Sequence, residues 1–267
     1  PKVVLTPTQR QTNATRRALA ERGLAETTTW AFLARAQAEL FVGDLPLVPL
    51  ANPISSDLDV LRPSLIPNLA AAAGRNAARG LADSAFFEGA KPGAQVNVAC
   101  ALRGGHTAER HWSGGRRPVD AYDAKADALA ALEAAGASIS GLQTAVASGP
   151  WFHPGRSGVL KLGNQILAAF GEVHPRVLAA LDVKGPVVAC EVFLERIPQP
   201  KRKAGSARPL LKPSPFQPVE RDFAFVVANE VAAETVLRAV RNADKDLISG
   251  ANLFDVYTGP GVGEGRK

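Results

Sequence analysis

Residues 51–80 read ANPISSDLDVLRPSLIPNLAAAAGRNAARG and say more about the fold than any other part of the chain. Pro63 and Pro67 are typical of a loop, because proline fixes φ and has no amide hydrogen to donate. The alanine-rich run at 69–78 favours a helix, since alanine has the highest helix propensity. Taken alone, the stretch is a loop followed by a helix that packs against another element.

The composition is that of a folded protein with room for two domains. The chain has 267 residues, of which 46% are apolar, enough for a sizeable core. No run of roughly 18 or more apolar residues could span a membrane, and residues 1–21 lack the apolar centre of a signal peptide. Cys100 and Cys190 show no CxxC spacing, so we expect two reduced core residues in a cytoplasmic protein. The absence of methionine suggests an internal piece of a longer polypeptide.

Most of the positive charge lies in one segment. The formal net charge is +6, and residues 199–221 carry one acid, Glu220, against the cations Lys201, Arg202, Lys203, Arg208, Lys212 and Arg221. A basic segment attracts polyanions, of which RNA is the obvious candidate. The alternative is a solvated linker kept soluble by its charge.

The residues before 198 predict an α+β domain on a mainly antiparallel sheet. The expected helices, in addition to 69–78, are 8–22, 33–40, 123–135 and 176–181, with Gly23 and Gly136 ending two of them. The expected strands are 26–32, 84–88, 96–102, 159–162, 166–170 and 187–194, with a brief extended run at 45–50. Gly163-Asn164 is placed to turn a hairpin.

A proline-rich segment separates this domain from a smaller one. Helices and central strands are disfavoured there by Pro200, Pro209, Pro213, Pro215 and Pro218. We therefore divide the chain into a core at 1–197, a linker at 198–211 and a small domain at 212–267. Strands at 221–227 and 248–257 around a helix at 232–242 would form the first half of a ferredoxin-like split βαβ unit, which makes this domain incomplete.

Further stretches, taken with residues 51–80, resemble the beta-subunit family of bacterial phenylalanyl-tRNA synthetases. They are His111-Trp112, RPVDAYDAKA at 117–126, FHPGRS at 152–157, GEVHP at 171–175, PSPFQPVERD at 213–222 and FDVY at 254–257. They occur in the family's order and cover nearly the whole chain, so together they are specific for this family, although any one of them alone would not be.

The resemblance implies a fold and a role. The fold would be α+β, a class II synthetase-like core with a mixed, mainly antiparallel sheet and helices, followed by a truncated ferredoxin-like anticodon-binding domain. The core would be noncatalytic and would assemble with the catalytic alpha subunit in an α2β2 heterotetramer that joins phenylalanine to tRNA(Phe). That whole enzyme would use ATP and Mg²⁺, and this fragment would bind neither.

The resemblance also suggests which residues act. It implies RNA contacts from basic and aromatic side chains, which bind phosphates and unstacked bases: Lys201, Arg202, Lys203, Lys212, Phe216, Arg221 and Tyr257. It gives structural or interface roles to Arg62, Asp57, His153, Arg156 and His174. We expect Arg62 to hold the interface with alpha or to bind a buried carboxylate such as Asp57 or Asp59. We expect Phe223 and Phe225 to face the core of the small domain.

No catalytic or metal residue is expected in the chain itself. An ATP site of this class needs glycine where the backbone approaches the nucleotide, and the corresponding segment, 187–196, has none, although it ends in Glu195-Arg196 as an active motif does. The histidines lack zinc-ligand spacing. His153 and His174 each precede proline and are expected to hydrogen-bond turn backbone.

The sequence is also compatible with other function classes. The main alternative is a free-standing synthetase-like paralogue that acts as an RNA-binding or regulatory module. An enzyme with its own ATP site is disfavoured by the missing glycines, and neither a membrane nor DNA is an expected partner.

Overall fold

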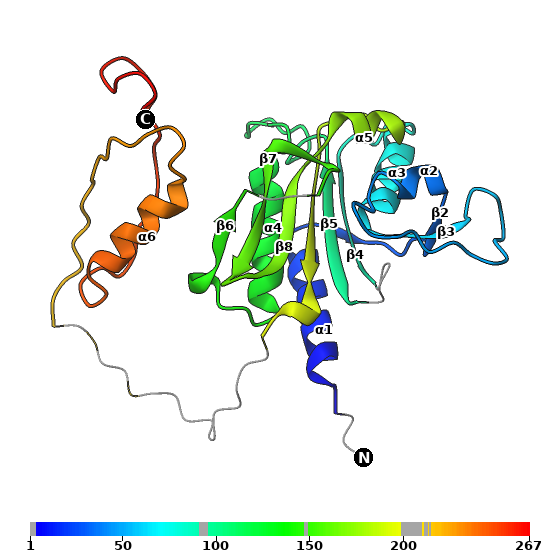
Figure 1. Cartoon of the computed structure of the whole chain (residues 1–267), viewed down its shortest axis with the longest axis horizontal. Coiled ribbons are helices and arrows are strands. Elements are labelled where there is room, and N and C mark those ends of the chain that lie inside the picture. The colour runs from blue at the N-terminus through cyan, green and yellow to red at the C-terminus, as the bar shows by residue number, and fades with distance from the viewer. Residues whose placement is uncertain (1–3, 91–95, 147–148, 199–209, 211–212, 214) are drawn as a thin grey trace. The chain divides into compact units, whose positions relative to one another are not determined.

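The computed structural model describes residues 4–90, 96–146, 149–198, 210, 213 and 215–267, and the chain divides into two compact units, 1–201 and 202–267 (Figure 1). The first unit is built on a seven-stranded sheet. Its strands run in the order β1 (Ala25–Glu26), β4 (Ser84–Ala90), β5 (Val98–Gly104), β9 (Val187–Phe193), β8 (Gln165–Val173), β7 (Phe152–Leu162) and β6 (Gln143–Ala145). Neighbouring strands are antiparallel except β1 and β4, which are parallel, so the expected mixed sheet is present.

One face of the sheet is covered by α1 (Pro7–Glu21) and α4 (Ala121–Ala134). Both helices begin at a capping box, in which the first side chain accepts an amide hydrogen bond and a later side chain returns one. Thr6 and Gln9 form the box of α1, and Asp120 and Asp123 form that of α4. Gly23 and Gly136 follow the two helices with φ of 79° and 93°, so the glycine stops predicted from the sequence are confirmed.

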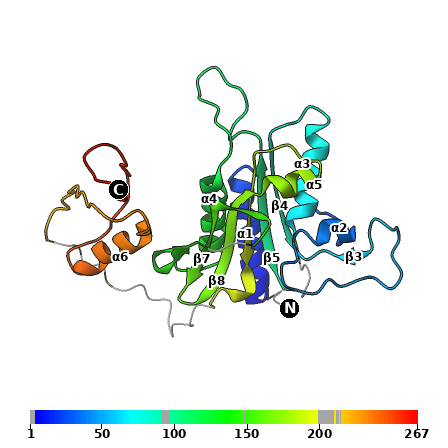
Figure 2. The ribbon, with the colours of Figure 1, turned by 45° about the horizontal axis from the view of Figure 1, so that its top comes forward.

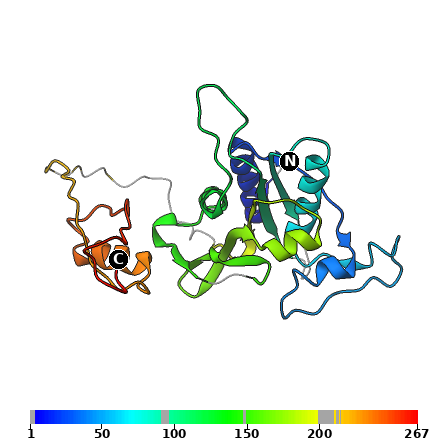
Figure 3. The ribbon, with the colours of Figure 1, turned by 90° about the horizontal axis from the view of Figure 1, so that it is seen from above.

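The opposite face is covered by α3 (Ile66–Ala77) and α5 (Pro175–Ala180). The alanine-rich run is part of α3, and its buried side includes Leu69, Ala70 and Ala73. A two-stranded sheet of β2 (Phe32–Leu33) and β3 (Val60–Leu61), with the short helix α2 (Arg35–Ala38), lies beyond the β4 side of the large sheet (Figures 1 and 3). Two 3₁₀ turns complete the unit, η1 (Ile139–Gly141) and η2 (Leu194–Arg196).

Two glycines of the β7–β8 hairpin have a physical reason to be glycine. Gly163 turns the hairpin with φ of 58°, as the Gly-Asn pair predicted. Gly171, in the GEVHP stretch, lies so close to β7 that a Cβ atom would come within 2.4 Å of the Ser157 Cβ. A side chain at 171 would therefore push the two strands apart.

The segment 26–32 differs from the single strand predicted for it. Only β1 and β2 at its ends pair as strands, and the residues between them make individual hydrogen bonds to β4 instead. Thr27 donates its amide hydrogen to the Phe87 carbonyl (2.8 Å), and the Thr29 hydroxyl donates to Glu88 (2.6 Å). The run at 45–50 is likewise reduced to one isolated bridge, Pro49 to Val60.

The second unit contains α6 (Ala233–Ala243), as predicted, but not the two predicted strands. Residues 221–227 and 248–257 form no strand, and backbone pairing joins only 227–229 to 265–267, through bonds such as Val227 N–H to the Lys267 carbonyl (3.0 Å). No described residue of this unit is buried. A strand needs a paired neighbour and a covered face, and these segments have neither within the described residues.

In the described part of the chain, none of the helices has the length and apolarity required to cross a lipid bilayer.

Candidate functional site

Arg62 lies just after β3 and is buried, with 4% of its surface exposed. Its guanidinium donates to Glu88 Oε1 (2.9 Å) and to the Thr29 hydroxyl (2.7 Å). Thr29 in turn donates to the second oxygen of Glu88 (2.6 Å), which closes a three-residue cluster. The buried carboxylate predicted for Arg62 is therefore present, but it is Glu88.

Asp57 and Asp59 do not reach Arg62, and the prediction that one of them would pair with it is wrong. Asp57 is exposed in the loop before β3, where its backbone N–H donates to Ser55. Asp59 accepts the backbone N–H of Arg35 at the start of α2 (2.9 Å). Both carboxylates belong to the small sheet and its loop, whereas the Arg62 side chain points toward the large sheet.

Glu88 is one end of a polar row that crosses the large sheet. The strand register pairs Glu88 of β4 with Cys100 of β5, and Cys100 with Glu191 of β9. Glu191 accepts the Ser64 hydroxyl (2.8 Å) and the Leu65 amide (3.3 Å). The segment that begins at Arg62 thus covers both ends of the row, and all six residues are at most 5% exposed.

The buried environment of this row does not favour catalysis. Burial raises the pKa of the Glu191 carboxyl, against the opposing effect of the bonds from Ser64 and Leu65. Burial also raises the pKa of the Cys100 and Cys190 thiols, so neither is a ready nucleophile. The two cysteines are free and buried, as predicted, and their adjacent positions in the β5–β9 ladder point them to opposite faces of the sheet.

Strand β9 corresponds to the segment that binds ATP in active enzymes of this class, and here it is covered on both faces. Its residues from Val187 to Val192 are buried, alternately under α4 and under the α3 side. Beyond it, Glu195 accepts two bonds from Asn97, and the Arg196 guanidinium lies over the Phe193 ring at 4.1 Å. The Glu-Arg ending therefore makes structural contacts.

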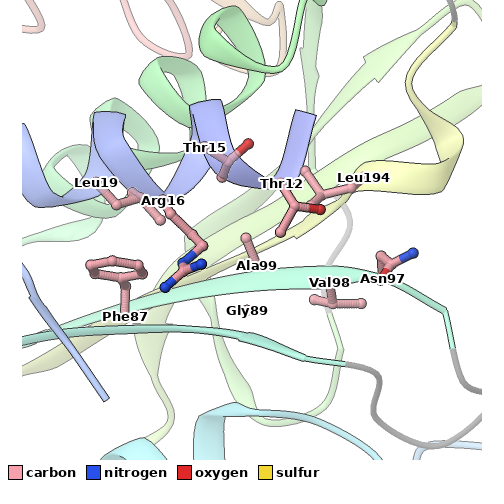
Figure 4. Close-up of a pocket in the computed structure, with 10 residues that line it drawn as sticks. All are labelled: Thr12, Thr15, Arg16, Leu19, Phe87, Gly89, Asn97, Val98, Ala99 and Leu194. Carbon is pink, nitrogen blue, oxygen red and sulfur yellow. The ribbon is translucent and has the colours of Figure 1, made fainter. Parts of the chain in front are cut away.

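A small cavity lies between α1 and the strands β4 and β5 (Figure 4). Its volume is about 50 Å³, and Thr15 and Arg16 of α1 lie above Phe87 and Ala99 of the sheet. Small-molecule sites begin at roughly 300 Å³, so this space suits water. A wider hollow of about 470 Å³ beside the start of α1 is lined by uncharged residues, which cannot neutralise a triphosphate.

The structure brings His153, Arg156 and His174 together where β7 begins and β8 ends. The two imidazole rings stack with centroids 6.1 Å apart, and Arg156 pairs with Glu172 of β8. His153 Nδ1 accepts the Gly155 amide and His174 Nδ1 accepts the Arg176 amide, each at 3.1 Å. The prediction that both rings hydrogen-bond turn backbone is confirmed.

The predicted RNA contacts fall into two groups. Lys201, Arg202, Lys203 and Lys212 lie outside the described residues. Phe216, Arg221 and Tyr257 are exposed on the second unit, where the Tyr257 hydroxyl donates to the Pro260 carbonyl (3.3 Å).

Phe223 and Phe225 are not core residues in this chain, contrary to the prediction. They are 70% and 53% exposed and stack with ring centroids 6.4 Å apart. No described element of the second unit covers their face, because the strand on which they were expected to alternate is not formed.

The sequence did not reveal Asp127, which lies on the buried side of α4 and is 1% exposed. Its carboxylate accepts from Arg22 after α1 (2.5 Å) and from two nitrogens of Arg103 on β5 (2.6 and 2.9 Å). In the sequence, the only sign of its burial was that this acidic residue occupies a helix position at the spacing of the apolar residues. Among the described residues, no group of three or more histidine, cysteine or acidic side chains gathers as metal ligands would.

Comparisons with known proteins cover both units. Residues 1–194 match the family described as phenylalanyl tRNA synthetase beta chain CLM domain, and residues 214–267 match the ferredoxin-fold anticodon binding domain. Relatives named phenylalanine–tRNA ligase beta subunit include those of Paramagnetospirillum magneticum and Rhodospirillum rubrum, each 55% identical over 100% of this chain. The relative from Bradyrhizobium diazoefficiens is 48% identical over the same share. The chain spans 34% of the length of each of these relatives.

Two solved structures of pyrrolysyl-tRNA synthetase from Desulfitobacterium hafniense share the fold. Their TM-scores are 0.51 and 0.52 at 19% identity, over 70% and 71% of this chain and 64% and 67% of theirs. At this identity the likeness is one of fold alone.

Proposed function

The chain belongs to the phenylalanyl-tRNA synthetase beta chain family, and we propose that it supports aminoacylation of tRNA(Phe) by assembling with the catalytic alpha subunit and contacting the anticodon arm. The observation that carries this is that the first unit matches the beta chain CLM domain and the second unit matches the ferredoxin-fold anticodon binding domain. The first unit then serves as a synthetase-like scaffold and the second as the anticodon-binding part. The boundaries we propose for them are 1–197 and 212–267, with 198–211 as the linker.

The buried sheet face supports a scaffold role. In place of an open substrate site, it has α3, the Arg62–Glu88 pair and the Ser64–Glu191 bond. A nucleotide needs glycine backbone and cationic groups within reach, whereas β9 is glycine-free and buried on both faces. We therefore assign ATP and Mg²⁺ to the whole enzyme, which we place in the cytoplasm as an α2β2 heterotetramer.

The assembly is tested with this chain and the matching alpha subunit in size-exclusion chromatography. The expected result is stable co-elution, because a scaffold subunit has a permanent interface that does not need substrates. The chain run alone gives the reference position. A folded chain that never co-elutes with alpha, with or without tRNA, would contradict the assembly role and favour a free-standing module.

The tRNA contact is tested by Tyr257→Ala in the alpha–beta complex. If Tyr257 stacks on a base, its removal should weaken tRNA(Phe) binding by roughly 5- to 150-fold, since one such stack contributes about 1–3 kcal/mol. The matched control is the chain's other tyrosine, Tyr122 on α4, which is 76% exposed. Equal affinities for Tyr257→Ala and Tyr122→Ala in fluorescence titration would remove Tyr257 from the proposed contact, and Phe216 and Arg221 would be tested next in the same way.

A further inference from the structure

Two histidine–proline turns meet at one end of the large sheet. His153 begins the first turn near the start of β7, and His174 begins the second, directly after β8 and before α5 (Figure 2). In each turn the ring nitrogen Nδ1 accepts the backbone N–H two residues later, that of Gly155 or Arg176, at 3.1 Å. Histidine thus takes the place that asparagine has in an Asx turn, where a side-chain acceptor binds the same N–H.

Each turn fixes a piece of the fold. His174 is the N-cap of α5, and its own backbone N–H donates to the Trp151 carbonyl (2.8 Å). The His153 turn closes an irregular part of β7, since the β7–β8 register breaks between Phe152 and Ser157. The Ser157 hydroxyl donates to the His153 carbonyl (2.6 Å). The two turns therefore hold the beginning of α5 and the bulge of β7.

The two rings stack on each other, with centroids 6.1 Å apart and planes at 22°. An Nδ1 atom that accepts an N–H carries no proton, so each neutral ring holds its proton on Nε2. A second proton can then bind only to Nδ1, where it faces the amide hydrogen of the turn. Proton uptake therefore removes the turn bond, and uptake by both rings places two positive charges side by side.

The neighbouring charges do not compensate for added protons. Arg156 of β7, Glu172 of β8 and Arg176 of α5 lie at this end of their elements. Arg156 already binds both oxygens of Glu172 (2.5 and 2.9 Å), and Arg176 adds another positive charge. The other charged groups on or directly after these elements lie at the far ends: Lys161, Asp182 and Lys184.

We propose that His153 and His174 form an acid-sensitive latch, in which proton uptake by the pair opens both turns and releases the beginning of α5 and the bulge of β7. Histidine changes its charge between about pH 5 and pH 8. The stabilisation by the two turn bonds is present while both rings are neutral and is lost as the pH falls through this range. The latch needs neither a partner subunit nor tRNA, so it stands apart from the function proposed above.

The test compares the whole chain with His153→Asn, His174→Asn and the double variant at about pH 8 and about pH 5, the limits of the histidine range. The asparagine oxygen accepts the same N–H and gains no proton in this range. Hydrogen exchange is followed by mass spectrometry on peptides that contain Gly155 and Arg176, corrected for the intrinsic effect of pH. In the wild type we expect protection to fall roughly 10-fold at the lower pH, the factor for one net hydrogen bond. The double variant should keep its protection.

The matched control is His111→Asn. His111 Nδ1 accepts the Ser113 amide in the same way (3.2 Å), but its ring lies in an exposed loop beside Trp112 and does not cap a helix. This variant should lose protection around Gly155 and Arg176 at low pH as the wild type does. The comparison separates the stacked pair from a single histidine with the same local bond.

Two results would overturn the latch. One is an equal loss of protection in the wild type and the double variant, because asparagine cannot take up the proton. The other is a loss that His111→Asn prevents as fully as the double variant does, since the sensitivity would then not belong to the stacked pair. If the double variant does not fold at the higher pH, each single variant is expected to keep protection at its own turn, and a wild-type response in both would equally contradict the proposal.

Discussion

Replacing Arg62 with methionine should lower the free energy of unfolding by roughly 3–5 kcal/mol, the usual effect of removing one partner of a buried ion pair. Glu88 is 3% exposed and would keep only its bonds to Thr29. Its charge would then be buried without a counterion, a costly arrangement in a medium of low polarity. Urea denaturation of the whole chain, followed by circular dichroism, measures the change.

Two further variants show that the loss comes from the unpaired charge. The double change Arg62→Met with Glu88→Met should recover most of the stability, because replacing both partners with apolar groups is often nearly neutral. Arg35→Ala breaks a longer, more exposed contact with Asp59 (3.8 Å) and should cost at most about 1 kcal/mol. If Arg62→Met costs no more than Arg35→Ala, the buried cluster does not contribute as we infer.

Changing Asp127 to alanine should destabilise the chain by about 3 kcal/mol or more. The Asp127 carboxylate is buried and binds Arg22 and Arg103, and so joins the end of α1, strand β5 and helix α4. Without it, Arg103 would have its guanidinium close to the apolar core of that face, with 15% of its side chain exposed. Thermal unfolding monitored by tryptophan fluorescence reports the loss.

The control for Asp127 is an exposed ion pair between α1 and β1. Arg16 of α1 pairs with Glu26 at 2.6 Å, but these side chains are 48% and 41% exposed. Glu26→Ala should therefore cost less than about 1 kcal/mol, because solvent screens an exposed pair. Similar losses for Asp127→Ala and Glu26→Ala would mean that Arg22 and Arg103 find solvent or other partners once the carboxylate is gone.

Local patterns predicted the elements of the first unit well. The helices α1 and α4 begin at capping boxes and are followed by glycines at positive φ, all of which can be recognised from neighbouring residues. The β7–β8 hairpin was marked by Gly163-Asn164. The strands predicted in the second unit are absent, since a strand depends on what lies beside it and these segments have no partner or cover within the described chain.

The amino-acid sequence by itself determined the family, most of the longer helices and strands of the first unit and the lack of glycine in β9, since all three depend on residues close together in the chain or on their spacing. The tertiary structure alone decided which charges meet. Arg62 pairs with Glu88, 26 positions away, and Asp127 binds Arg22, 105 positions away. Such partners are chosen by strand register and helix packing, and an acid nearer in the sequence, such as Asp57, is left at the surface because its loop faces away from the sheet.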